Sequence, residues 1–342
     1  MRQLHAQIIC SLLLGGLLCT PALAQDKVQE TQEQIVSMRQ CLALLSQDAA
    51  NDTSIGDLRE RCRQQIDPVE SAEQELRSNQ SGVINERKAL EDVASENPFV
   101  LTPHRINYLL PISWRDDTSD FSDSLGVDKE GVDNTEVEFQ LSVKVHIARG
   151  ILGDGTLSGA YTGRSFWQAY NKEYSAPFRE TNHEPELILS YTNDWEWLGF
   201  RNVGNQLIFN HQSNGRSEPL SRSWNRVMLN FLFEKDRFAM SFRPWYRIPE
   251  DREDDDNPDI EHYMGHFEWM GFYQWHDRTL SIMVRNNLRS DSRGAIELGW
   301  SFPISSKIKA YVKYFNGYGE SLIEYNNSLQ SVGIGVLISD WL

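Results

Sequence analysis

Polar and apolar residues alternate along most of the chain from Asn97 onward. The longest uninterrupted example runs from Glu136 to Ile147, where every second residue is apolar. Residues two apart in a β-strand lie on the same face, so this pattern predicts a strand with one apolar and one polar face. Such a strand is long for a soluble sandwich and is about what a tilted membrane-spanning strand requires.

The same alternation recurs along the chain, interrupted by turn-forming residues such as those at 290–294 and 325–328. We count about twelve candidate strands in about 245 residues, which predicts an all-β fold, a transmembrane antiparallel β-barrel. A soluble two-sheet sandwich is the alternative, and it would have shorter strands. The clearest apolar series lie at Leu280–Val284, Ile296–Ile304, Ile308–Tyr314 and Val332–Ile338.

Residues 25–96 follow a helical period instead. Apolar residues recur every three or four positions from Ile35 to Leu45 and again from Ile55 to Ile66, with a break at 51–54. This pattern predicts a small helical region before the barrel: a helical hairpin and then a third, polar helical stretch to about Ser95. Nothing in it suggests chemistry, so we interpret it as a periplasmic spacer or docking segment.

The first 24 residues have the features of a secretory signal peptide. A short basic start precedes an apolar run from Ile8 to Leu18, and Ala22-Leu23-Ala24 supplies a cleavage sequence. Its removal leaves Cys41 and Cys62, which an oxidising compartment would join in a disulfide; two buried free thiols are the alternative. The predicted domains are a signal peptide (1–24), a helical periplasmic region (25–96) and a barrel (97–342).

Composition narrows the class of protein further. The formal net charge of -16 argues against nucleic acid as a partner. No run of 18 apolar residues follows residue 25, which argues against a helical membrane protein. The mean hydropathy of -0.51 still suits a β-barrel, because only every second strand residue faces lipid. The 10 Trp residues would fit the aromatic girdles of such a barrel.

Candidate catalytic residues flank the turn between two predicted strands. His211 and Ser213 continue the apolar series of the first strand, and Asn225 begins the apolar series of the second. If the two strands pair with His211 opposite Asn225, their Cβ atoms would lie about 5 Å apart. This grouping supplies a nucleophile, a base and a group that orients the base.

The period of the strands also predicts where these three side chains point. In a transmembrane barrel the apolar face meets lipid and the polar face lines the lumen. His211, Ser213 and Asn225 belong to the apolar series, so they project toward lipid near the rim. A polar group facing lipid is unfavourable unless it has a partner, and a lipid substrate would explain its presence.

These residues resemble the outer membrane phospholipase A family over residues 97–342. The resemblance implies a twelve-stranded barrel in the bacterial outer membrane, with the active site on its exterior. It also implies a calcium-dependent enzyme that is active as a homodimer. The match is carried by His211–Arg216 and Ser221–Arg226, and it is supported by Ser175–Asn182, Asp255–Ile260 and Gly317–Ile323.

The resemblance implies a role for each matching residue. Ser213 corresponds to the nucleophile, His211 to the general base and Asn225 to the residue that orients the base. The backbone N–H of Gly215 corresponds to part of the oxyanion hole. The expected reaction is hydrolysis of the acyl esters of phospholipids and lysophospholipids, as expected of a phospholipase A1/A2.

The same resemblance implies a Ca²⁺ site made of oxygen atoms, the ligands that calcium prefers. Its ligands correspond to the backbone carbonyl of Arg216, the side chain of Ser221 and Ser175 of the partner subunit. Glu218 and Asp256 match a second, weaker calcium site.

His262 and His266 would point the same way on a strand, and we interpret them as structural.

Several features depart from the family pattern. Residues 25–96 exceed the expected length, Gly163 stands where a glutamine is expected, and the chain ends at Leu342 rather than at an aromatic residue. They motivate an alternative hypothesis, a non-catalytic pore or structural barrel. No Gly-x-Ser-x-Gly sequence surrounds Ser213, so an α/β-hydrolase is excluded.

Overall fold

A computed structural model describes residues 82–95, 101–116, 132–173, 175–251, 253, 255–305 and 308–340. The predicted signal peptide, the helical hairpin with Cys41 and Cys62, and the terminal residue Leu342 lie outside these residues. Among the described residues, no helix is both long and apolar enough to cross a membrane.

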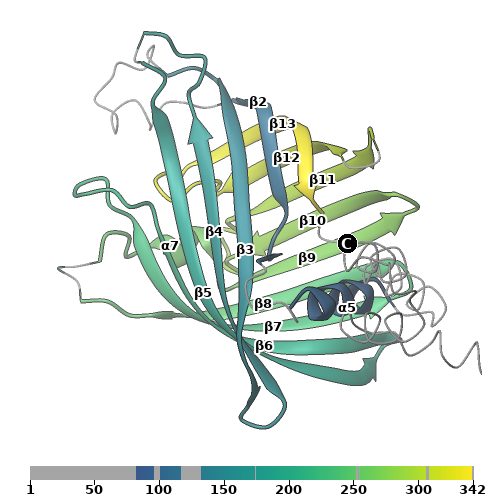
Figure 1. The fold of residues 1–342 in the computed structure, drawn as a ribbon. Coiled ribbons are helices and arrows are strands. Elements are labelled where there is room, and N and C mark those ends of the chain that lie inside the picture. The colour runs from purple at the N-terminus through teal and green to yellow at the C-terminus, as the bar shows by residue number, and fades with distance from the viewer. Residues whose placement is uncertain are drawn as a thin grey trace, which may run out of the picture. The chain divides into compact units, whose positions relative to one another are not determined.

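Twelve long antiparallel strands close into a barrel (Figure 1). Each strand pairs with its neighbours in sequence, and β13 pairs with β2 to complete the circle. The short β1, Thr102–Pro103, pairs with β3. The strands are β2 Asn107–Arg115, β3 Thr135–Ile151, β4 Gly155–Trp167, β5 Phe178–Trp197, β6 Phe200–Ser213, β7 Ser223–Lys235, β8 Phe238–Ile248, β9 Phe267–Trp275, β10 Arg278–Asn286, β11 Gly294–Pro303, β12 Lys309–Tyr318 and β13 Ser328–Ser339. The predicted barrel of about twelve strands is confirmed, and the sandwich alternative is discarded.

The two faces of each strand divide as the alternation predicts. Outward-facing apolar side chains such as Leu141, Leu298 and Ile334 are exposed, whereas inward-facing polar side chains are buried. Many charged groups in the lumen are paired; Lys313 Nζ, for example, lies 2.5 Å from Glu138. Buried charges need such partners, because leaving one unpaired in a low-dielectric interior is strongly unfavourable. A polar network therefore occupies the interior.

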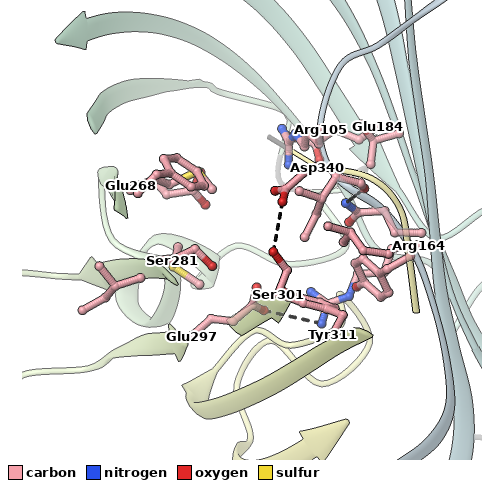
Figure 2. A pocket seen from close by; sticks show the side chains of 18 of the residues that line it. Arg105, Arg164, Glu184, Glu268, Ser281, Glu297, Ser301, Tyr311 and Asp340 are labelled. Atoms are coloured by element: carbon pink, nitrogen blue, oxygen red, sulfur yellow. Dashed lines mark hydrogen bonds and ion pairs between the residues drawn. The ribbon is translucent and has the colours of Figure 1, made fainter. Parts of the chain in front are cut away.

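A cavity of about 140 Å³ remains within this network (Figure 2). Polar side chains that line it form hydrogen-bonded pairs. Arg105 donates to Glu184 at 2.9 Å, and the Ser301 hydroxyl donates to Asp340 at 3.0 Å. The cavity lies inside the barrel, whereas the predicted catalytic residues belong to the outward face.

The β12–β13 loop folds into the barrel at the end that carries His211. Leu322 is 2% exposed and its backbone N–H donates to Asn182 Oδ1 at 3.1 Å. Glu324 accepts hydrogen bonds from Arg115 and Arg179 on the barrel wall. Part of the Gly317–Ile323 motif thus builds a loop that covers one end of the lumen.

Helix α5, Val83–Ser95, packs at the opposite end of the barrel (Figure 1). Ile84 is buried against apolar residues of β6, β8 and β9, and its backbone N–H donates to Glu234 Oε2 at 2.8 Å. The acidic side chain at the helix N-terminus satisfies an N–H that has no partner within the helix. Lys88 Nζ donates to Thr192 Oγ1 at 2.9 Å. The helix therefore covers the second end of the lumen.

His262 and His266 do not lie together on a strand. Helix α7, Ile260–Met264, occupies this part of the β8–β9 connection, and its residues Ile260 and Met264 are buried one helical turn apart. Burial with a period of four is typical of a helix. Each histidine pairs with a carboxylate, His262 with Asp291 at 2.7 Å and His266 with Glu261 at 3.3 Å.

Candidate active site

β6 and β7 form the predicted hairpin, with His211 directly opposite Asn225 and Ser213 opposite Ser223. The His211 Nδ1 and Asn225 Oδ1 atoms lie 2.9 Å apart. Because an amide oxygen only accepts hydrogen bonds, Nδ1 carries the proton and Nε2 is left as the basic nitrogen. Ser213 lies two residues along the same strand, so its side chain shares the face of His211.

These side chains lie on the outer surface of the barrel. Phe209, which precedes His211 on the same face, is 51% exposed, and Leu229, which follows Asn225 on the same face, is 46% exposed. A shallow groove of about 440 Å³ runs beside His211 and Asn225, and Phe209 is part of its apolar lining. The polar side chains of His211 and Asn225 therefore lie beside an apolar surface that could bind acyl chains.

Glu250 extends the hydrogen-bonded group beyond the residues that the sequence indicated. Asn225 Nδ2 donates to Glu250 Oε1 at 2.8 Å. Glu250 follows the end of β8, where Ile248 pairs with Asn225. The sequence does contain a signal for its position. Residues 246, 248 and 250 are two apart, so Glu250 is expected on the outward face that carries Tyr246 and Ile248.

The loop between β6 and β7 is organised by Asn214. Its side-chain oxygen accepts hydrogen bonds from the backbone N–H groups of Arg216 at 3.2 Å and Arg222 at 3.0 Å. Its Nδ2 donates to the Leu220 carbonyl at 2.8 Å. Gly215 has φ +66°, a conformation that glycine adopts without strain. The loop is thus a closed turn with its own internal hydrogen bonds.

The expected calcium ligands of one subunit lie on this loop. The Arg216 guanidinium donates to the carbonyl of Arg179 at 2.6 Å, which ties the loop to β5. Ser221 lies at the other end of the loop, and Ser175 belongs to the β4–β5 connection with φ +60°. Within the described residues, no group of three or more His, Cys, Asp or Glu could hold a metal. The available donors are oxygen atoms of carbonyls, hydroxyls and paired carboxylates, which suit calcium.

Glu218 and Asp256 meet beside Ser221. The hydrogen bond and the negative charge of Asp256 raise the pKa of the exposed Glu218 carboxyl. Burial opposes ionisation of Asp256, but hydrogen bonds with Glu218 and Ser221 lower the pKa of Asp256 below its usual value. The Glu218 carboxyl therefore takes up a proton more readily than the Asp256 carboxyl does.

Gly163 has a structural explanation. A Cβ atom at residue 163 would lie 3.2 Å from the Tyr161 hydroxyl, so the Tyr161 ring occupies the space beside this glycine. There the Tyr161 hydroxyl bonds His183 Nδ1 at 2.6 Å. His183 pairs with Ser213 in the β5–β6 register. A second imidazole, which the sequence analysis did not identify, therefore lies on the strand beside Ser213.

The sequence of residues 84–338 matches a family described as "Phospholipase A1". The phospholipase A1 of Klebsiella pneumoniae is 41% identical over 249 residues, which cover 72% of this chain and 84% of that protein. The Escherichia coli K12 phospholipase A1 is 40% identical over 249 residues, 72% of this chain and 83% of that protein.

This chain belongs to the phospholipase A1 family.

Solved structures of the family share the fold. The E. coli outer membrane phospholipase A has a TM-score of 0.67 at 39% identity, covering 71% of this chain and 100% of that one. The Salmonella typhi outer membrane phospholipase, a dimer with bound calcium, has a TM-score of 0.67 at 38% identity, covering 71% and 94%. An E. coli active-site mutant with asparagine replaced by alanine has a TM-score of 0.68 at 38% identity, covering 72% and 95%.

These similarities confirm the expected family, phospholipase class and outer-membrane location. The outward-facing apolar surface of the barrel is therefore its lipid-facing surface. The match begins at residue 84, so α5 belongs to the region that resembles the family.

Proposed function

We propose that this protein hydrolyses acyl ester bonds of phospholipids and lysophospholipids at its lipid-facing surface, with Ser213, His211 and Asn225 as the catalytic residues. The observation that carries the proposal is the hydrogen bond between His211 Nδ1 and Asn225 Oδ1, on a hairpin whose outward face also presents Ser213. The E. coli mutant named for an active-site asparagine supports a role for an asparagine in such a site.

The reaction begins when His211 Nε2 accepts the proton of the Ser213 hydroxyl. The Ser213 oxygen then attacks the acyl carbonyl, and the backbone N–H of Gly215 stabilises the oxyanion. His211 returns the proton to the leaving glycerol oxygen, and an acyl-enzyme remains. Water, deprotonated by His211, releases the fatty acid and restores Ser213. Catalytic hydrogen bonds often tighten only when substrate binds, so Ser213 and His211 need not be bonded in the free protein.

Calcium is part of the proposal because its donors are available beside the site. The Arg216 carbonyl, the Ser221 side chain and Ser175 of the partner subunit would hold it, which makes the active form a homodimer. When bound there, calcium would add positive charge close to the developing oxyanion. The S. typhi structure, a calcium-bound dimer, supports this assignment.

The test is fatty-acid release from phospholipid by the purified barrel in detergent, first with calcium and then with chelator. We expect calcium-dependent release that Ser213→Ala abolishes, while that variant still migrates as a folded barrel on an unheated gel. Release that persists in Ser213→Ala would overturn the catalytic assignment. Release that persists in chelator would retain Ser213 as the nucleophile and remove the calcium site.

A further inference from the structure

Asn225 leaves the proposed base without a charged partner. When His211 takes the Ser213 proton it becomes an imidazolium, and a neutral amide stabilises that charge less well than a carboxylate does. The side-chain amide of an asparagine can also rotate by about 180°. It would then present its N–H donor, instead of its oxygen acceptor, to His211 Nδ1. Something else must fix the amide orientation and supply negative charge.

Glu250 has the position to do both. Its Oε1 accepts a hydrogen bond from Asn225 Nδ2 at 2.8 Å, so the opposite end of the same amide points Oδ1 at His211 Nδ1, 2.9 Å away. The two bonds form a continuous chain from the imidazole to the carboxylate. A carboxylate only accepts hydrogen bonds when ionised, so it selects this amide orientation over its reverse.

The backbone explains how Glu250 reaches this place. Ile248, the last residue of β8, is directly opposite Asn225, and Glu250 is two residues further on, at the diagonal position. Diagonal neighbours on one face remain within reach of long side chains. The Glu250 side chain is half-buried, and within the described part of the chain no lysine or arginine forms an ion pair with it. Its negative charge is therefore directed at Asn225.

We propose that Glu250 is a positioning residue of the hydrolytic site, acting on His211 through Asn225; the inference rests on the proposed function. The proton moves only from Ser213 to His211 and then to the leaving oxygen, and neither Asn225 nor Glu250 gains or loses one. The Glu250 carboxylate holds the amide in register and polarises its oxygen. It thereby stabilises the imidazolium that forms with the transition state.

Single substitutions give the first test, measured as kcat and KM for phospholipid in mixed micelles with calcium. Glu250→Ala removes both the hydrogen bond and the charge, and kcat should fall about 10- to 100-fold with little change in KM. Glu250→Gln keeps an acceptor for Asn225 Nδ2 but removes the charge, so its kcat should lie between those of Glu250→Ala and the wild type. Glu253→Gln, an exposed acid in the same loop, is the matched control and should behave as wild type.

A charge exchange gives the sharper test. Asn225→Asp alone places a second carboxylate beside that of Glu250, and neither can donate a hydrogen bond to the other. The hydrogen-bonded chain from His211 to Glu250 is then broken, and kcat should fall steeply. In Asn225→Asp with Glu250→Gln, the glutamine amide can donate to Asp, whose other oxygen accepts from His211. The double variant should therefore regain at least about tenfold in kcat over Asn225→Asp.

The outcomes separate the two proposals. Equal activity of Asn225→Asp with and without Glu250→Gln, in variants that all migrate as folded barrels, would overturn the role of Glu250. So would wild-type kcat in Glu250→Ala. If Ser213→Ala retained hydrolysis, the proposed function itself would fail. Loss of hydrolysis in Ser213→Ala together with wild-type kcat in Glu250→Ala would remove the Glu250 inference alone.

Discussion

Single residues around the candidate site, on the outer face of the barrel, are held by hydrogen bonds with their neighbours. Asn225 bonds both His211 and Glu250, and His183 is bonded by Tyr161. A side chain fixed in one rotamer loses little further freedom when the transition state forms. The exposed position of the site therefore does not prevent it from being well ordered.

The Glu218–Asp256 pair leads to a prediction about pH. The raised pKa of Glu218 means that it takes up a proton at a higher pH than an ordinary glutamate, whereas Asp256, with a lowered pKa, stays ionised. A protonated carboxyl is a poor calcium ligand, so calcium affinity at this pair should fall as pH falls through the raised pKa. Glu218→Gln should weaken calcium binding about tenfold and remove this pH dependence.

Calcium titrations by calorimetry at several pH values, in detergent, would measure both effects. Glu253→Gln serves as the control for general surface charge. A pH dependence that is unchanged in Glu218→Gln would show that other groups release the proton.

At the scale of elements, the β6–β7 loop is a unit whose shape depends on one side chain. Asn214 makes three of its hydrogen bonds, to Arg216, Leu220 and Arg222. The strands on either side are held by the continuous β-ladder and not by this loop. Local disorder of the loop is therefore separable from unfolding of the barrel.

Asn214→Ala removes the three side-chain hydrogen bonds of Asn214, worth about 1 kcal/mol each. Gly215 and Arg216 would then leave their positions, and the rate of hydrolysis should fall at least about tenfold. The barrel should unfold at the wild-type temperature. Asn214→Asp is the matched control: it keeps the acceptor for the two backbone N–H groups and should retain more activity than Asn214→Ala. Equal activity of the two variants would show that the acceptor does not hold the loop.

At the scale of the whole molecule, the lumen is covered at both ends. Helix α5 packs at one end and the loop containing Leu322 folds into the other, with a network of paired charges between them. A passive pore needs a continuous aqueous path, and these three layers lie along it. The arrangement favours the lipolytic surface over the pore hypothesis.

We therefore expect no steady single-channel conductance when the purified protein is inserted into a planar bilayer. A general porin in the same bilayer would be the positive control. Discrete conductance steps from the wild-type protein, together with absence of fatty-acid release, would instead support the pore hypothesis.

The sequence by itself determined the strand faces and the hairpin that contains the candidate site. A period of two places every second side chain outward, so the alternation from Leu207 to Ser213 was enough to predict an outward His211. The turn residues at 214–222 predicted that this strand forms a hairpin with the next, and the structure shows that the hairpin pairs His211 with Asn225. The resemblance supplied the expected roles of these residues, which the geometry of the hairpin accommodates.

Only the tertiary structure decided which groups support the site and what fills the lumen. Glu250 bonds Asn225 from 25 residues away, and Glu234 caps α5 from 150 residues away. The Tyr161 ring that bonds His183 occupies the space beside Gly163, where a Cβ atom would lie 3.2 Å from the Tyr161 hydroxyl. Periodicity fixes the direction of a side chain relative to its own strand. It does not specify which distant side chain lies beside it, because that depends on strand register, loop path and the space left by neighbours.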